Sequence, residues 1–112
     1  MRDIKESDWK LLRKVHLEAL ERFSEQILTE VKRIESDGAK GYHQRYLDLW
    51  ELLGRRNKEM GEAFDDLRRS RATFRIASIK ALGVLTEAEF SRFSQETREE
   101  VSLLLGIRAT ER

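Results

Sequence analysis

The chain turns at Ser36-Asp37-Gly38-Ala39-Lys40-Gly41, a polar, glycine-containing segment between two long helical patterns. Glycine commonly follows the last residue of a helix because it adopts the left-handed conformation without steric cost. Gly38 is therefore predicted to stand just after the end of the first helix. The segment predicts two long antiparallel helices joined by a short turn.

The pattern before the turn has a single apolar face at helical spacing. Ser7 and Asp8 suit the first position of a helix, and acidic residues are favourable in its first turn. We predict a helix over about residues 7–36. Its apolar face consists of residues spaced by three and four, namely Trp9, Leu12, Val15, Ala19, Phe23, Ile27, Val31 and Ile34.

The pattern after the turn shows no firm stop before Gly83, so we predict one helix over about residues 41–82. Gly54 and Gly61 interrupt it and lie seven residues apart on one side of the helix. They either mark a bend at 54–61 or allow another helix to approach closely. A heptad seam runs through Tyr46, Trp50, Leu53, Asn57, Met60, Phe64, Leu67, Arg71, Phe74, Ser78 and Ala81.

The last quarter of the chain predicts two short helices, over about residues 87–93 and 95–105. Gly83 is expected to end the preceding helix, and Thr86 with Glu89 has the form of a capping box. Phe90 and Phe93 are expected to point into the core. The segment 79–90 resembles the Gly-x-Leu/Ile-Thr-x-x-Glu-Phe turn of short C-terminal helical hairpins in bacteria. This resemblance implies no function. The chain is predicted to be one domain, 1–112.

The composition supports an all-α fold, a bundle-like helix hairpin with two short C-terminal helices. Proline is absent, and about half of the chain is Ala, Leu, Glu, Lys and Arg, which is typical of long helices and coiled coils. No stretch approaches the roughly 18 apolar residues of a membrane span, and no apolar signal segment follows the N-terminus. We therefore expect a cytoplasmic protein without a membrane partner.

The sequence offers no catalytic or cofactor motif. There is no cysteine, and the only two histidines, His16 and His43, do not stand in the metal-binding spacings of helical proteins. The carboxylates of residues 59–66 alternate with basic residues in i,i+4 pairs, which indicates a solvated face. We therefore expect a non-enzymatic protein with no cofactor and no metal.

The predicted second helix is too long for a compact domain of this size. At ~1.5 Å per residue it is roughly 60 Å long, whereas a compact domain of this size has a diameter near 35 Å. A second copy of the chain would cover its apolar seam, and two helix hairpins form a four-helix bundle. We predict a homodimer or adaptor with an interface at Trp50, Leu53, Gly54, Asn57, Met60, Gly61, Phe64, Leu67 and Phe74. A break in this helix would instead give a compact monomer.

An alternative function rests on basic residues, although the net charge of the whole chain is only +1. Arginine suits phosphate through its planar fork of donors. The alternative is a small nucleic-acid-associated protein whose phosphate contacts are Arg55, Arg56, Arg68, Arg69, Arg71 and Arg75.

Overall fold

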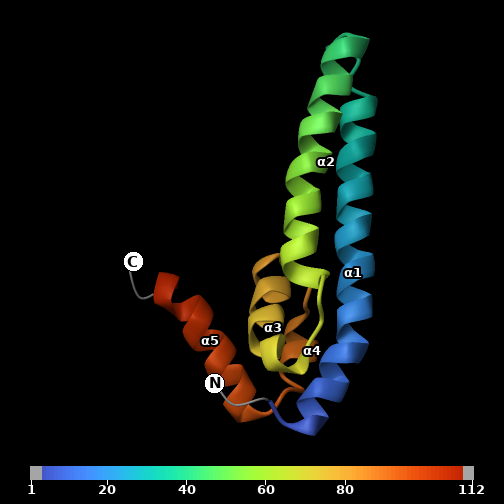
Figure 1. Ribbon diagram of the computed structural model, residues 1–112. Helices are drawn as coiled ribbons and strands as arrows, with labels where there is room; N and C mark the ends of the chain where they lie inside the picture. The colour runs from blue at the N-terminus through green and yellow to red at the C-terminus, as the bar shows by residue number, and fades with distance from the viewer. Residues whose placement is uncertain (1–3, 110–112) are drawn as a thin grey trace.

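The computed structural model describes residues 4–109, and these residues form helices and connecting turns without a strand (Figure 1). The all-α, bundle-like fold predicted from the composition is confirmed. The α-helices are α1 (Glu6–Glu35), α2 (Tyr42–Phe64), α3 (Ala72–Ala81), α4 (Glu87–Phe90) and α5 (Gln95–Ala109), with a 3₁₀ turn, η1 (Arg69–Arg71), before α3.

Helices α1 and α2 form the predicted antiparallel hairpin. The turn is closed by Asp37, whose carboxylate accepts a hydrogen bond from the Ala39 N–H at 3.1 Å. Among the described glycines only Gly83 has a positive φ, so the predicted role of Gly38 was wrong. Aspartate replaces the left-handed glycine here because its side chain bonds the backbone two residues later.

The predicted single helix over residues 41–82 was wrong, because α2 ends at Phe64. Helix α2 passes through Gly54 and Gly61 and stops at two aspartates. Asp66 adopts a left-handed conformation with φ of 56°, which aspartate tolerates better than most residues. Two carboxylates also oppose the negative end of the helix dipole. The chain therefore reverses over residues 65–68.

This reversal changes which residues of the third helix are buried. In α3 the buried set comprises Ala72, Thr73, Ile76, Ala77 and Ile79. The predicted seam residues of this segment are outside that set, and Phe74 is 39% exposed. The heptad seam therefore ends at Phe64, and the packing of α3 against α1 and α5 follows a different face.

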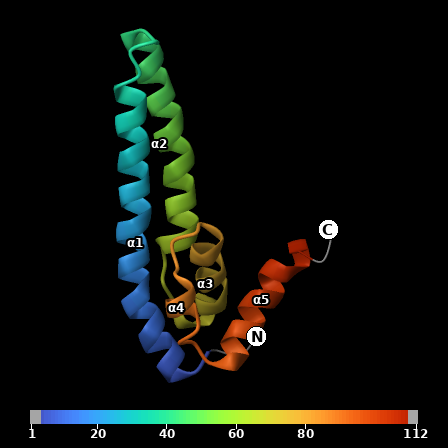
Figure 2. The same cartoon turned by 180° about the vertical axis from the view of Figure 1, so that it is seen from behind.

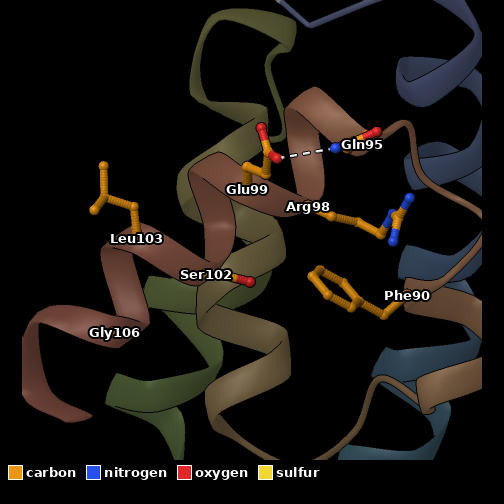
Figure 3. A pocket seen from close by; sticks show the side chains of 7 residues that line it. All are labelled: Phe90, Gln95, Arg98, Glu99, Ser102, Leu103 and Gly106. Carbon is orange, nitrogen blue, oxygen red and sulfur yellow. Dashed lines mark hydrogen bonds between the residues drawn. The ribbon is translucent and has the colours of Figure 1, made fainter. Parts of the chain in front are cut away.

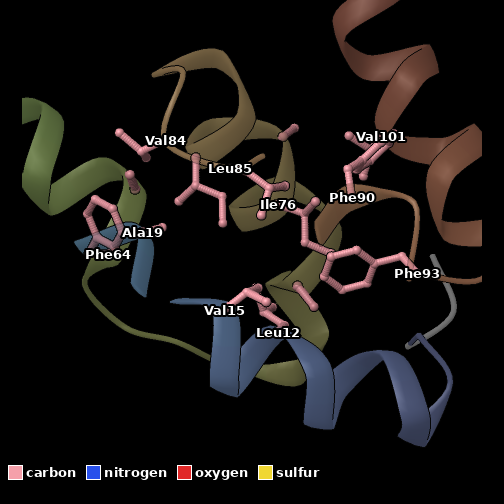
Figure 4. Packing of buried hydrophobic residues seen from close by; sticks show 14 of the residues in the cluster. Leu12, Val15, Ala19, Phe64, Ile76, Val84, Leu85, Phe90, Phe93 and Val101 are labelled. Carbon is pink, nitrogen blue, oxygen red and sulfur yellow. The ribbon is translucent and has the colours of Figure 1, made fainter. Parts of the chain in front are cut away.

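The hydrophobic core lies at the base of the hairpin, where all five α-helices meet (Figure 4). Leu12 and Phe23 of α1, Ile76 of α3 and Val101 of α5 are fully buried. Phe93, which follows α4, is also buried, as the sequence predicted. Residues from both ends of the chain thus form one core.

The turn between α3 and α4 follows the predicted signals. Gly83 has φ of 77°, and the Val84 N–H donates to the Ile79 carbonyl at 3.2 Å, as in a Schellman motif. The Thr86 hydroxyl accepts from the Glu89 N–H, and the Glu89 carboxylate accepts from the Thr86 N–H. Both predicted caps are confirmed.

Glu89 also ties this turn to the long helix α1. Its carboxylate accepts two hydrogen bonds from Arg22, at 2.7 and 2.8 Å, and the same guanidinium donates to the Val84 carbonyl. The hydrogen bond from Arg22 is the largest cause that lowers the pKa of Glu89 to about 2, against the opposing effect of burial. This fork-shaped pair joins segments 67 residues apart.

Replacing Glu89 by glutamine is expected to lower the free energy of unfolding by about 1–3 kcal/mol at pH 7. Because the folded pKa of Glu89 lies below its unfolded value, its contribution is present above about pH 4.5 and is lost as the pH falls toward 2. Urea unfolding at pH 7 and near pH 2 measures both values. Glu87→Gln, at a side chain 85% exposed, is the matched control and should change little. An equal Glu89→Gln effect at both pH values would contradict the argument.

The N-terminus of α5 is held by a residue from the other end of the chain. Asp8 of α1 is buried and accepts hydrogen bonds from the Ser94 N–H and hydroxyl and from the Thr97 hydroxyl. Ser94 caps α5 through its hydroxyl, which accepts from the Thr97 N–H at 3.4 Å. Asp8 was predicted as a candidate N-cap of the first helix, which was wrong, because α1 begins at Glu6 and Asp8 lies in its first turn. Its place beside α5 was not predicted.

The molecule is elongated. Its radius of gyration is 16.8 Å and its longest extent 52 Å, whereas a compact domain of this length has a radius near 13 Å. Figures 1 and 2 show the reason, since the turn-side half of the α1–α2 hairpin extends past α3, α4 and α5. We call this half, residues 24–57, the arm.

Candidate interaction surface

The two helices of the arm hold each other through a narrow contact. Ile27 and Leu52 are its buried apolar residues. Arg56 of α2 joins the helices by donating to Glu30 of α1 at 2.9 Å, and it also donates to Glu59 of its own helix at 2.8 Å. The Glu59 and Glu30 bonds raise the pKa of the Arg56 guanidinium, although its partial burial opposes them. The arm therefore has little core of its own.

The tip of the arm is closed by a polar cluster beside the turn. Lys40 and Gln44 both donate to the Asp48 carboxylate, at 2.8 and 2.9 Å. These two hydrogen bonds, with that of Lys40 the larger, lower the pKa of Asp48. Arg45 donates to the Glu35 carbonyl at 2.6 Å and lies over the Tyr42 ring. The turn is thus tied down by contacts within the chain.

Large apolar side chains are exposed along the arm. Trp50 is 72% exposed and Tyr46 60% exposed, and they lie one helical turn apart on α2. Leu28 of α1 is 67% exposed. We define the arm face as Leu28, Tyr42, Tyr46, Trp50 and Leu53, which are all exposed.

The two helices contribute to the same side of the arm. A hollow of about 240 Å³ brings Ile34 and Glu35 of α1 together with Tyr42, Tyr46 and Leu49 of α2. Leu28 lies seven residues before Glu35, which places it on the same side of α1 two turns lower. The arm face is therefore a two-helix surface.

The predicted interface residues divide into an exposed group and a core group. Trp50, Leu53, Gly54 and Asn57 are exposed on α2, and a Cβ atom added at Gly54 would meet nothing within 4 Å. The other members lie lower. Met60 and Leu67 pack against the core, Phe64 is buried against His16 and Phe23, Gly61 is partly exposed, and Phe74 is on α3.

Burial of the seam thus increases from the tip to the base. Phe64 is covered by its own chain and does not belong to an open surface. Toward the tip, beyond the part that its own chain covers, the stripe continues with the exposed residues Leu53, Trp50 and Tyr46. The sequence did not predict Leu28 and Tyr42 as part of this interface, because their exposure depends on how the hairpin packs.

Most of the arginines predicted to contact nucleic acid instead make contacts within the chain. Arg56 binds Glu30 and Glu59, as described above, and Arg69 holds the N-terminal segment through the Ile4 carbonyl and Glu6. The others are Arg68 paired with Asp66, Arg71 over the Phe74 ring, Arg75 donating to the Glu62 carbonyl, and Arg55 exposed on α2. These contacts distribute the arginines over several elements.

A further hollow lies beside α5, outside the arm. It has a volume of about 610 Å³ and is an open groove between Phe90 of α4 and one side of α5 (Figure 3). The described residues contain no group of three potential metal ligands. The His16 ring packs on the Phe64 ring, with 5.3 Å between the ring centroids. Burial is the larger cause that lowers the pKa of the His16 imidazole, and the positive charge of Arg75 lowers it further.

No family model, curated protein or solved structure matches this chain. Within the part of the chain that the structure describes, none of the helices combines the length and apolarity required to cross a membrane. A role for the arm face is therefore inferred from the chemistry of its own residues alone.

Proposed function

We propose that this protein is a non-enzymatic helical interaction protein that self-associates through the arm face, chiefly through α2. The observation that carries the proposal is the exposed apolar stripe of Tyr46, Trp50 and Leu53 on an arm that lies outside the core. Two hairpins packed by such faces form a four-helix bundle dimer. The cytoplasmic location expected from the sequence belongs to the same proposal.

The exposed area is a substantial part of what a stable dimer requires. Aromatic side chains bury about 150–250 Å² each when covered, and Tyr42, Tyr46 and Trp50 are 86%, 60% and 72% exposed. These three residues alone offer on the order of 400 Å², about half of the ~800 Å² that each partner contributes to a typical interface. Leu28 and Leu53 add to this area. The largest exposed apolar patch on a protein, at several hundred Å², is often functional.

The arm also gains stability from a partner, because its two helices share few buried side chains. An isolated pair of helices exposes most of its apolar surface, and helices in water depend on tertiary packing. A second hairpin would supply that packing along the whole arm. Nucleic-acid binding is less well supported, since Arg56, Arg68, Arg69, Arg71 and Arg75 already have contacts within the chain.

Light scattering over a concentration series tests the proposal. We expect a dimer for the native chain and a monomer for Trp50→Glu at the same concentrations. Loss of a central tryptophan costs about 2 kcal/mol or more of binding energy, about thirtyfold in Kd. Leu28→Glu should also weaken the dimer.

The matched control is Leu103→Glu on α5. Leu103 is 69% exposed and Leu28 67% exposed, so the two substitutions add the same charge at equally open leucines. Leu103→Glu should leave the dimer intact. A monomeric native chain at every concentration would overturn the proposal, as would equal weakening by both leucine substitutions.

A further inference from the structure

Two rows of residues that complement each other border the arm face, and the row on α1 continues to Glu21, just below the arm. On α1, Glu21, Leu28 and Glu35 are spaced by seven residues and lie on one side. On α2, His43, Trp50 and Asn57 are also spaced by seven. All six side chains are exposed. The row on α1 is therefore acidic at its ends and apolar at its centre. The row on α2 has polar hydrogen-bond donors at its ends and an aromatic side chain at its centre.

The two rows also match in height along the arm. Arg45 bonds the carbonyl of Glu35 near the tip, and Phe64 packs on His16 near the base. Between these two levels, residues of α1 and α2 pair in antiparallel order. Within about one helical turn, His43 is therefore level with Glu35, Trp50 with Leu28, and Asn57 with Glu21.

We propose that two copies associate with their tips at the same end, so that α1 of each copy packs on α2 of the other. This inference rests on the proposed self-association and adds its geometry. A two-fold axis parallel to the arm keeps equal residues at equal heights. It places Leu28 beside Trp50 of the second copy, Glu35 beside His43, and Glu21 beside Asn57. Every neighbouring pair of helices is then antiparallel.

The opposite orientation brings like charges together. With tips at opposite ends and the axis level with Leu28, α1 of one copy lies on α1 of the other. Glu21 of each copy then meets Glu35 of the second copy. Within residues 4–106 neither carboxylate has a side-chain partner to neutralise it. Like-charge contacts across an interface oppose association, so the pairing of α1 with α2 is favoured.

The cysteine-free chain allows a direct test by cross-linking. The single variants Glu21→Cys, Glu35→Cys and Asn57→Cys change exposed positions, and circular dichroism verifies that each is folded. Variants are mixed in pairs, one carrying a mass tag, and treated with a short bis-maleimide reagent. We expect a band near twice the 13.2 kDa chain mass as the main product of Glu21→Cys with Asn57→Cys. Each variant alone should stay at background, because equal residues lie on opposite sides of the bundle.

The outcomes separate the geometry from the self-association itself. If light scattering shows a dimer and the main cross-link joins Glu21→Cys to Glu35→Cys, the proposed orientation is overturned and the proposed function is left in place. A dimer without a Glu21–Asn57 link also overturns the orientation. A monomer at every concentration overturns both.

Discussion

Replacing Phe23 by alanine is expected to cost about 3–5 kcal/mol of unfolding free energy. Phe23 is fully buried where the arm joins the base. Its ring packs 5.9 Å from the Phe64 ring, and the Arg56 guanidinium lies over it at 5.7 Å. Truncation removes the ring and leaves a cavity between α1 and α2. The loss is a large part of the 5–15 kcal/mol that stabilises a typical domain.

Urea unfolding followed by circular dichroism measures this loss. One protein concentration is used throughout, because self-association makes stability concentration-dependent. Leu103→Ala, at an exposed leucine, is the control and should change the free energy by less than about 0.5 kcal/mol. A Phe23→Ala loss below about 1 kcal/mol would show that the junction is not closely packed.

Replacing Asp8 by alanine is expected to cost about 2–4 kcal/mol and to loosen α5 selectively. The change removes the acceptor for the Ser94 N–H and hydroxyl and for the Thr97 hydroxyl, and Thr97 is buried. Buried donors without an acceptor each cost about 1–3 kcal/mol. The carboxylate also lies at the N-terminus of α5, where a negative charge is favourable.

Hydrogen exchange measures the local effect, because amides of α5 should lose more protection than those of α2. Asp8→Asn keeps one carbonyl acceptor and should lose about half as much stability. Burial by itself would raise the pKa of Asp8, but the hydrogen bonds from Ser94 and Thr97 outweigh it and lower the pKa. The contribution of Asp8 is therefore present at neutral pH and is lost in acid. Uniform loss of protection across the chain would contradict the local role.

The error in α2 shows where periodicity misleads. The heptad seam continues in the sequence past Phe64, yet Asp65 and Asp66 end the helix. Periodicity records which residues are apolar, whereas local backbone preferences decide where a helix stops. Two adjacent aspartates at the end of a helical segment were the signal that could have predicted the break. The dimer hypothesis then lost its argument from helix length and now depends on the exposed arm face.

The arm face itself was only partly predictable. Trp50, Leu53, Gly54 and Asn57 were predicted and are exposed on α2. Phe64 was predicted in the same interface and is buried in the core. The sequence places these residues on one stripe, because spacing by three and four sets a common face of a helix. Which part of that stripe is covered depends on where α3 folds back.

Local chemistry alone determined the helical class, the long first helix, the Gly83 stop and the Thr86–Glu89 cap. Each of these depends on neighbours within about four residues, so a linear pattern contains the information. The tertiary structure alone decided the Asp8 contact with α5, the Arg22–Glu89 pair and the exposure of the arm face. Those features join residues far apart in the chain, and their partners are set by how the segments pack.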